Sequence, residues 1–353
     1  MLTDAARVLI PSVLSFVIGI GITPLVAHYL YTFRAWKKKG GKGKGIGDDT
    51  GTPLFDELHR EREVSTPRMG GIVVWGAVII TALGLAILGL IFGGVYEEYA
   101  FVNRGQTWLP LFALVVGAIV GLFDDILEVT KSSGGLSLRY RLAIIATLGT
   151  FIGWWFYVKL GVSQVGVPFL GPLELGWLFV PFFVLVMLAL YAGGIIDGLD
   201  GLAGGVFAFI FMTYAGIAFA QNQIALAAFA ASVAGALFAF LWFNIPPARF
   251  YLSETGTMAL TAALAVTAFS ADVLGEGVGV AVLPIIAFPL TITVITTVLQ
   301  TISKRVFKKK LFIIAPIHHH FEALGWPAYK VTMRYWVITV IAGIFGLSLA
   351  LLK

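Results

Sequence analysis

The sequence predicts an all-α, polytopic integral membrane protein with about ten transmembrane helices, and two observations support this class: composition and run length. Hydrophobic residues make up 59% of the 353-residue chain and charged residues 12%, and the mean hydropathy is +0.93. Apolar runs of roughly 20 residues, the length that a helix needs to cross the hydrocarbon core, recur along the whole chain. We therefore expect a single transmembrane domain over residues 1–353, embedded in the lipid bilayer.

Ten segments are candidate spans. The first continues past the ordinary length of a secretion signal and lacks a small-residue cleavage site, so no cleaved signal peptide is expected. The ninth contains Pro284 and Pro289 and is expected to be bent or broken, because proline removes a backbone donor. In chain order the spans are 8–31, 71–95, 108–123, 142–158, 177–196, 206–220, 224–243, 258–271, 279–301 and 335–352.

The positions of Lys and Arg predict the orientation. The loops after the odd-numbered spans carry 20 of the 24 basic residues and 13 of the 19 acidic residues. Because basic loops stay in the cytoplasm, we expect these loops on the cytoplasmic side and both termini outside. The loops cover about 32–70, 124–141, 197–205, 244–257 and 302–334, and we expect them to hold the functional site. The Gly/Lys tract 37–47 in the first loop is expected to be a flexible linker that meets anionic headgroups.

Two adjacent carboxylates, Asp124 and Asp125, end the third span. Like charges at this distance repel one another, so a divalent metal ion is a natural partner. A solvated helix terminus would have the same pattern. The absence of cysteine excludes disulfides and thiolate metal ligands.

The loops after the fifth and seventh spans also carry acidic residues. The run Asp197-Gly-Leu-Asp200-Gly-Leu-Ala-Gly-Gly could bind a metal ion or a nucleotide, or form a tight turn capped by Asp. Asn244 ends the seventh span, and Glu254 stands just before the eighth. Glu254 could be a ligand or the cap of the helix that follows it.

Three of the five histidines stand together at His318, His319 and His320, near a basic cluster over residues 304–310. Adjacent imidazoles beside fixed cations indicate a site for phosphate, metal or proton transfer at a membrane surface. The alternatives are a solvated loop and an affinity tag. The internal position and the short length of the run argue against a tag.

Taken together, these motifs resemble the polyprenyl-phosphate N-acetylhexosamine-1-phosphate transferases. The resemblance covers nearly the whole chain and is strongest over Ala-Pro-Ile-His-His-His-Phe-Glu at 315–322. The triple histidine distinguishes this branch from the GlcNAc-1-phosphate transferases. Further matching positions are Thr66-Pro67, Met69-Gly-Gly71, Asp124-Asp125, Asp197-Gly-Leu-Asp-Gly-Leu202, Asn244, Gln300, Gly325-Trp-Pro327, Lys330-Val331 and Arg334-Tyr-Trp336.

The resemblance implies a reaction and its partners. Undecaprenyl phosphate would attack the β-phosphate of UDP-MurNAc-pentapeptide, giving lipid I and UMP, at the cytoplasmic face of the inner membrane of a bacterium. A bound Mg²⁺ would clamp the pyrophosphate. No nucleic-acid partner is expected, and the sequence does not decide between a monomer and a homodimer.

The resemblance also implies roles for the residues at matching positions. Catalytic roles fall to two carboxylates that would prepare the lipid phosphate and to three imidazoles that would contact phosphate or sugar. Metal ligands and nucleotide contacts come from the loops after the fifth and seventh spans. The catalytic residues are Asp124, Asp125, His318, His319 and His320, the metal ligands Asp197 and Glu254, and the nucleotide contacts Asp200 and Asn244.

Four positions depart from the pattern of the family. Glu63 and Glu128 stand where lysines are usual, Gly194 stands for an asparagine, and Glu254 stands for an aspartate. The first two replace a cation at positions expected to face phosphates. The cations that could compensate are Arg62, Arg68, Lys131, Arg139 and Arg141, and we expect Arg62, Lys131 and Arg141 to bind substrate.

Three other functions stay open at this point: a related transferase acting on another sugar, a diverged inactive paralogue, and a transporter or lipid-binding protein without chemistry. A transport pathway would place ionisable residues near the bilayer centre. Here they gather at the cytoplasmic ends of the spans, and this favours an enzyme.

Overall fold

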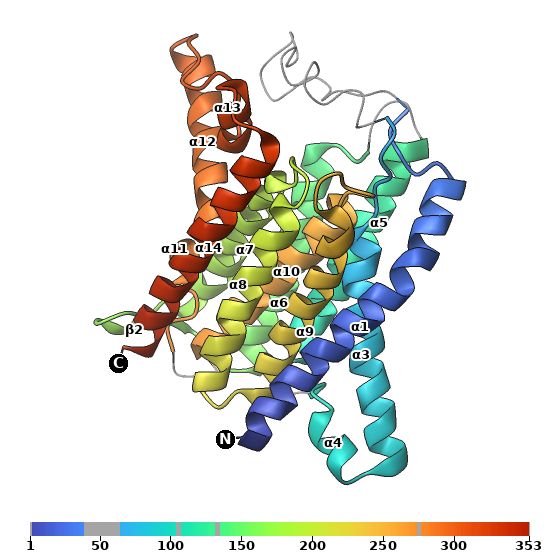
Figure 1. The fold of residues 1–353 in the computed structure, drawn as a ribbon. Coiled ribbons are helices and arrows are strands. Elements are labelled where there is room, and N and C mark those ends of the chain that lie inside the picture. The colour runs from blue at the N-terminus through green and yellow to red at the C-terminus, as the bar shows by residue number, and fades with distance from the viewer. Residues whose placement is uncertain (1, 39–63, 104–106, 131–134, 274–276, 353) are drawn as a thin grey trace.

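The fold is known from a computed structural model, which describes residues 2–38, 64–103, 107–130, 135–273 and 277–352. These residues form a bundle of long helices with few strands (Figure 1). The first half of the chain contains α1 (Leu2–Thr32), α3 (Gly71–Phe92), α4 (Val95–Tyr99), α5 (Trp108–Thr130), α6 (Leu138–Lys159), β1 (Gln164–Val167), β2 (Gly171–Glu174) and η1 (Gly176–Leu178). The second half contains α7 (Phe179–Gly193), η2 (Gly194–Ile196), α8 (Leu202–Ala220), α9 (Ile224–Asn244), α10 (Ser253–Val273), α11 (Leu283–Ile286), α12 (Phe288–Val306), α13 (Ile317–Ala323) and α14 (Ala328–Leu351).

Eight helical segments in this part of the chain are long and apolar enough to cross a membrane. They are α1, α3, α5, α6, the segment from η1 to η2 that contains α7, and α8, α9 and α14. The chain is thus a helical integral membrane protein, as predicted. The eighth and ninth predicted spans correspond to the apolar part of α10 and to α11 with α12. Both termini lie at the same end of the bundle (Figure 1).

Burial separates a central group of helices from a peripheral one. α8 and α9 have 72% and 83% of their apolar windows buried, whereas the windows of α1 and α14 are 28% and 22% buried. α10 lies among α5, α7 and α3, and its apolar side chains are enclosed. Large apolar side chains exposed on α1 and α14 suit contact with lipid, because acyl chains do not penalise them.

Glycines bring the backbones of α5 and α10 unusually close together. A Cβ added at Gly121 would lie 2.1 Å from the backbone oxygen of Glu254, and one at Gly117 would lie 2.6 Å from the backbone oxygen of Met258. Only glycine allows this approach. The carboxylates at the end of α5 therefore lie directly beside the first turn of α10.

The structure corrects the all-α prediction in one place. Between the fourth and fifth predicted spans, β1 and β2 form an antiparallel hairpin, in which Val167 pairs with Gly171. Phe169 in the turn and Gly171 at the start of β2 have positive φ angles of 64° and 80°. The hairpin is hard to predict from the sequence, because its strands have only four residues each and therefore show little alternation of apolar and polar residues.

The predicted ninth span is broken, as its prolines indicate. α11 ends at Ile286 and α12 begins at Phe288, with Pro289 in the first turn of α12. Beyond this break, α12 extends with α13 past the end of the bundle that lies opposite the termini (Figure 1). The histidine segment is part of this projecting arm.

Candidate functional site

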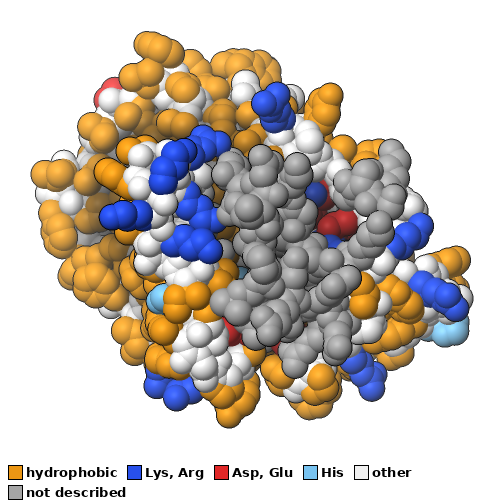
Figure 2. Space-filling view, turned by 90° about the horizontal axis from the view of Figure 1, so that it is seen from above, with side chains coloured by type: hydrophobic (Ala, Val, Ile, Leu, Met, Phe, Trp, Pro, Cys, Tyr) orange, Lys and Arg blue, Asp and Glu red, His pale blue; other side chains and the backbone are white. Residues whose placement is uncertain are grey.

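Charged residues gather at the end of the bundle opposite the termini. Viewed from that end, Lys and Arg side chains are spread over the surface, with a few acidic side chains visible between them (Figure 2). A cavity of about 560 Å³ opens here, a size that suits a small-molecule ligand. Its charged and aromatic lining consists of Lys37, Arg68, Glu128, Arg141, Tyr191, Asp197, Asp200, Tyr251 and Glu254.

Asp125 connects α5 to the first turn of α10. Its Oδ2 accepts hydrogen bonds from the Ser253 hydroxyl at 2.5 Å and from the backbone N–H and hydroxyl of Thr255 at 2.8 and 2.6 Å. Its Oδ1 accepts from Nε of Arg68 at 3.2 Å. The side chain is fully buried, so these donors replace the water that the carboxylate loses.

Asp124 faces Arg141, which also reaches α10. Nη2 of Arg141 lies 2.8 Å from Oδ2 of Asp124, and Nη1 lies 2.6 Å from Oε1 of Glu254. The backbone N–H of Leu136 donates to Oδ1 of Asp124. Asp124 is buried, whereas Arg141 and Glu254 line the cavity. Arg141 therefore joins a buried carboxylate to an accessible one.

Glu128 is paired with two cations rather than facing the cavity alone. Nζ of Lys37 lies 3.3 Å from its Oε1, and Nη2 of Arg68 lies 3.0 Å from its Oε2. Burial by itself would lower the pKa of Arg68, but the carboxylates of Asp125 and Glu128 raise it well above its usual value. Arg68 therefore stays charged, and of the cations expected to compensate for the missing lysine it is the one that the described residues place beside Glu128.

Asp197 and Glu254, the expected metal ligands, both line the cavity. Burial raises the pKa of Asp197 to about 6, although the Ser253 N–H and Arg68 oppose this rise. Burial raises the pKa of Glu254 to about 7 against the effect of Arg141. The nearby cations therefore do not fully compensate for the burial of these two carboxylates.

These two carboxylates fit a magnesium site that has few protein ligands. In the described part of the chain, no three His, Asp or Glu side chains are placed to hold a metal ion together. Mg²⁺, however, commonly binds through one or two carboxylates, with water and substrate phosphates completing its shell. Asp197 and Glu254 suit that mode, because they are under-compensated and accessible from the cavity.

Asp200 and Asn244 hold the loop between α7 and α8. Asp200 lines the cavity, and its Oδ2 accepts from the N–H of Ala248 at 3.1 Å. Asn244 is buried, and its amide accepts from the N–H of Gly201 at 2.9 Å and donates to the oxygen of Phe250 at 2.8 Å. The contacts of Asn244 in this structure are thus backbone contacts that shape the wall of the cavity.

The three histidines divide into a pair and a single residue. His318 and His319 are buried, and a Cβ added at Gly198 would lie 2.9 and 2.7 Å from their Nε2 atoms. Nδ1 of His319 is 2.7 Å from Oε2 of Glu322, which orients its ring. His320 instead accepts the N–H of Ile313 at 3.2 Å and packs beside Phe312. His318 and His319 therefore lie against Gly198, which lines the cavity, whereas His320 contacts the segment that precedes α13.

The sequence did not reveal several polar side chains that line the cavity. Lys37 falls in the tract that composition predicts to be a flexible linker, and Tyr191, Tyr251 and Thr297 belong to no predicted motif. At Gly194, one of the departures from the family pattern, an added Cβ would lie 3.2 Å from the Thr257 Cβ, so there is little room for a larger side chain. Arg62, Glu63 and Lys131 lie outside the described residues.

Comparison with known proteins shows what this chain is similar to. Residues 107–272 match the model of glycosyl transferase family 4. A phospho-N-acetylmuramoyl-pentapeptide-transferase of Chloroflexus aurantiacus is 33% identical over 307 residues, which cover 82% of this chain and 78% of the relative. The family match includes the carboxylates of α5, the loop after α7 and the start of α10.

Proposed function

Because this chain belongs to the phospho-N-acetylmuramoyl-pentapeptide-transferase family, we propose that it transfers phospho-MurNAc-pentapeptide from UDP-MurNAc-pentapeptide to undecaprenyl phosphate. The products are lipid I and UMP, and the setting is the cytoplasmic face of a bacterial inner membrane. The observation that carries the proposal is the cavity at one end of a membrane bundle, lined by cations and carboxylates together. Such a site can receive a polar nucleotide from water and a phosphate from lipid.

The reaction demands charge neutralisation and positioning rather than covalent chemistry by the protein. Arg141 and Arg68 provide fixed guanidinium groups for phosphate oxygens. Of the paired carboxylates, Asp125 is held by donors on both oxygens and keeps the site together. Asp124, whose carboxylate pairs with Arg141 and accepts the N–H of Leu136, is the candidate base for the lipid phosphate.

Asp197 and Glu254 would hold Mg²⁺. When bound, the ion would neutralise the charge that develops on the pyrophosphate and on the leaving UMP. The two carboxylates would hold the ion at the cavity, and the ion pair with Arg141 orients the carboxylate of Glu254. Rigorous chelation should abolish turnover, and added Mg²⁺ should restore it. Unchanged turnover after chelation would refute this assignment.

The decisive test is release of UMP. The purified chain in detergent is mixed with UDP-MurNAc-pentapeptide, a polyprenyl phosphate and Mg²⁺, and UMP and lipid product are measured. An Asp197→Asn variant of unchanged thermal stability serves as the control. Absence of UMP from an intact, folded preparation would exclude the transferase and favour the diverged paralogue. UMP release with UDP-GlcNAc but not with UDP-MurNAc-pentapeptide would show that the donor sugar is GlcNAc.

A further inference from the structure

Three charged side chains from separate segments meet at one wall of the cavity. Each oxygen of Glu128 is close to one cation, since Oε1 lies 3.3 Å from Nζ of Lys37 and Oε2 lies 3.0 Å from Nη2 of Arg68. The side chains are only 14%, 16% and 17% exposed for Lys37, Arg68 and Glu128. All three line the cavity, so both cations are partly desolvated where a ligand would bind.

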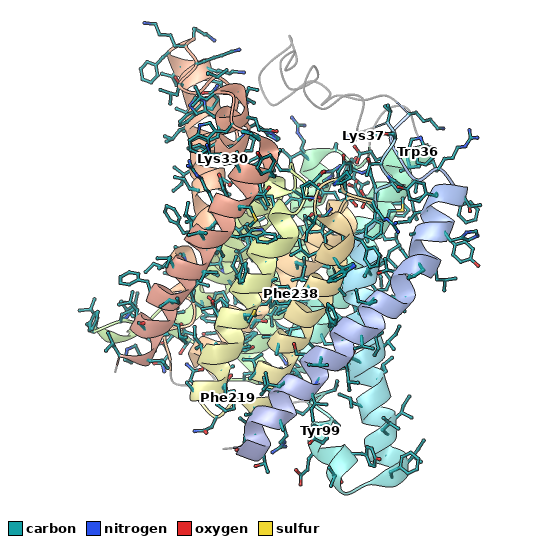
Figure 3. All side chains as sticks on the ribbon, viewed as in Figure 1. Trp36, Lys37, Tyr99, Phe219, Phe238 and Lys330 are labelled. Carbon is teal, nitrogen blue, oxygen red and sulfur yellow. The ribbon has the colours of Figure 1, made fainter. Side chains whose placement is uncertain are left out.

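Backbone hydrogen bonds hold the segments that carry the two cations. The N–H of Arg68 donates to the oxygen of Ala35 at 2.7 Å, and the N–H of Tyr251 donates to the oxygen of Pro67 at 2.8 Å. The segment after α1 is thereby joined to the segment before α3 and to the loop before α10. Lys37 follows directly from this fixed backbone at the end of α1 that faces away from the termini (Figure 3). Its placement differs from the flexible linker that composition predicted.

The bonding pattern leaves Arg68 suited to an anion. Nε and Nη2 are bonded to Asp125 and Glu128, so the plane of the guanidinium is fixed by two carboxylates from one helix. Nη1 carries two further N–H groups, and Arg68 lines the cavity. A fixed guanidinium beside an ammonium matches the anionic oxygens of a pyrophosphate.

We propose that Lys37 and Arg68 bind the pyrophosphate of the UDP-sugar donor, and that Glu128 is a positioning residue that holds both cations at the cavity wall. The inference rests on the proposed function, because that function supplies the UDP-sugar. Glu128 and the donor compete for the same two cations. Donor binding therefore exchanges a carboxylate for a phosphate at Lys37, and an acidic residue in this wall is compatible with an anionic ligand.

The competition predicts opposite effects for two neutral substitutions. Lys37→Gln should weaken UDP binding about 10-fold, the effect of losing one charge-assisted hydrogen bond. Glu128→Gln should tighten UDP binding several-fold, because the competing anion is gone, and should lower kcat because the cations are no longer oriented. A purely structural ion pair would not give opposite signs, since breaking it from either side has the same consequence.

Lys38 provides the matched control. It is the next residue in the chain and exposed, and its Nζ donates to the backbone oxygen of Thr130 at 3.0 Å rather than lining the cavity. Lys38→Gln should leave UDP affinity and turnover unchanged. Arg68→Lys should fold, because it keeps the charge beside Asp125, and should weaken UDP binding through loss of the forked donor.

The experiment measures UDP affinity by calorimetry on the full chain in detergent, with UMP release and thermal unfolding in parallel. Opposite shifts for Lys37→Gln and Glu128→Gln, with Lys38→Gln unchanged, support the inference. Equal affinities for Lys37→Gln and the natural chain, or weaker binding by Glu128→Gln, overturn it. If the natural chain releases UMP in either of these cases, only the inference fails. If the folded natural chain neither binds UDP nor releases UMP, the proposed function fails as well.

Discussion

Asp125 is a buried carboxylate whose donors come from two different parts of the chain. We predict that Asp125→Ala lowers the free energy of unfolding by about 3 kcal/mol, because two hydroxyls, a backbone N–H and a guanidinium lose their acceptor in a buried place. Thermal unfolding in detergent measures the loss. Ser253→Ala removes one donor only and should cost about 1 kcal/mol. Equal stability of Asp125→Ala and the natural chain would contradict the anchoring role.

Gly198 controls how closely the histidine pair approaches the cavity wall. Gly198→Ala should reduce turnover by at least about 10-fold and cost about 1–3 kcal/mol of stability, because the new methyl group would displace the buried rings of His318 and His319. Initial rates of UMP release measure this effect. Gly84→Ala is the control, since a Cβ there has no atom within 4 Å. Full activity of Gly198→Ala would show that the position of the pair is unimportant for catalysis.

Residue roles were only partly predictable from the sequence. Asp197, Asp200, Glu254 and Arg141 were predicted as site residues, and the structure brings all four to one cavity. Lys37 was not predicted, because its neighbours are glycines and lysines and its partner Glu128 is far away in the chain. An ion pair between distant segments leaves no local pattern.

At the scale of elements, Asp272 connects the hairpin to the end of α10. Its Oδ1 accepts from the N–H of Gly166 in β1 at 2.8 Å, and its Oδ2 accepts from the N–H of Val280 at 3.0 Å. Burial raises its pKa to about 6, although both N–H groups oppose the rise. The carboxyl therefore holds strand β1 and the segment before α11 to the end of α10.

This raised pKa predicts a pH dependence of stability. The ordinary value is 3.8, so between about pH 4 and 6 the folded chain binds the proton that the unfolded chain has released. Asp272 therefore contributes most to the free energy of unfolding at low pH, and this contribution is lost as the pH rises through 6. The total change is on the order of 3 kcal/mol.

The Asp272→Asn variant isolates this contribution. Thermal unfolding of the natural chain and the variant is compared from pH 5 to pH 7.5. The stability of the natural chain should fall relative to that of the variant as the pH rises, because Asn does not titrate. Parallel curves would show that Asp272 ionises at its ordinary pKa.

Helices were the most predictable elements, and short elements were the least. All ten predicted spans overlap helices of the structure, since a span is an apolar run that local composition reveals. The hairpin and α13 were not predicted. Each is held by contacts with other segments, such as those of Asp272 and of Gln300, whose amide bonds the backbone of Leu311 and Phe312.

At the scale of the whole molecule, the termini and the cavity lie at opposite ends of the bundle (Figure 1). The distribution of Lys and Arg predicts that the cavity end is cytoplasmic. Single cysteines introduced at exposed Lys309 and exposed Glu97 should therefore be labelled from the inside and the outside respectively. His319 would be a poor probe, because it is buried. Labelling of position 309 from outside only would reverse the topology.

Membrane class, the helical spans and the broken ninth helix followed from the sequence, because apolar run length, charge position and proline act locally along the chain. The pairing of the charges depended on packing. Arg141 on α6 and Glu254 on α10 are 113 positions apart, and the Asp125 carboxylate on α5 meets α10 because glycines bring these two helices together. Lys37 and Arg68 reach the same carboxylate, Glu128, because a backbone hydrogen bond joins the segment after α1 to the segment before α3. Such contacts depend on how the helices sit against one another, and no local pattern of residues encodes that arrangement.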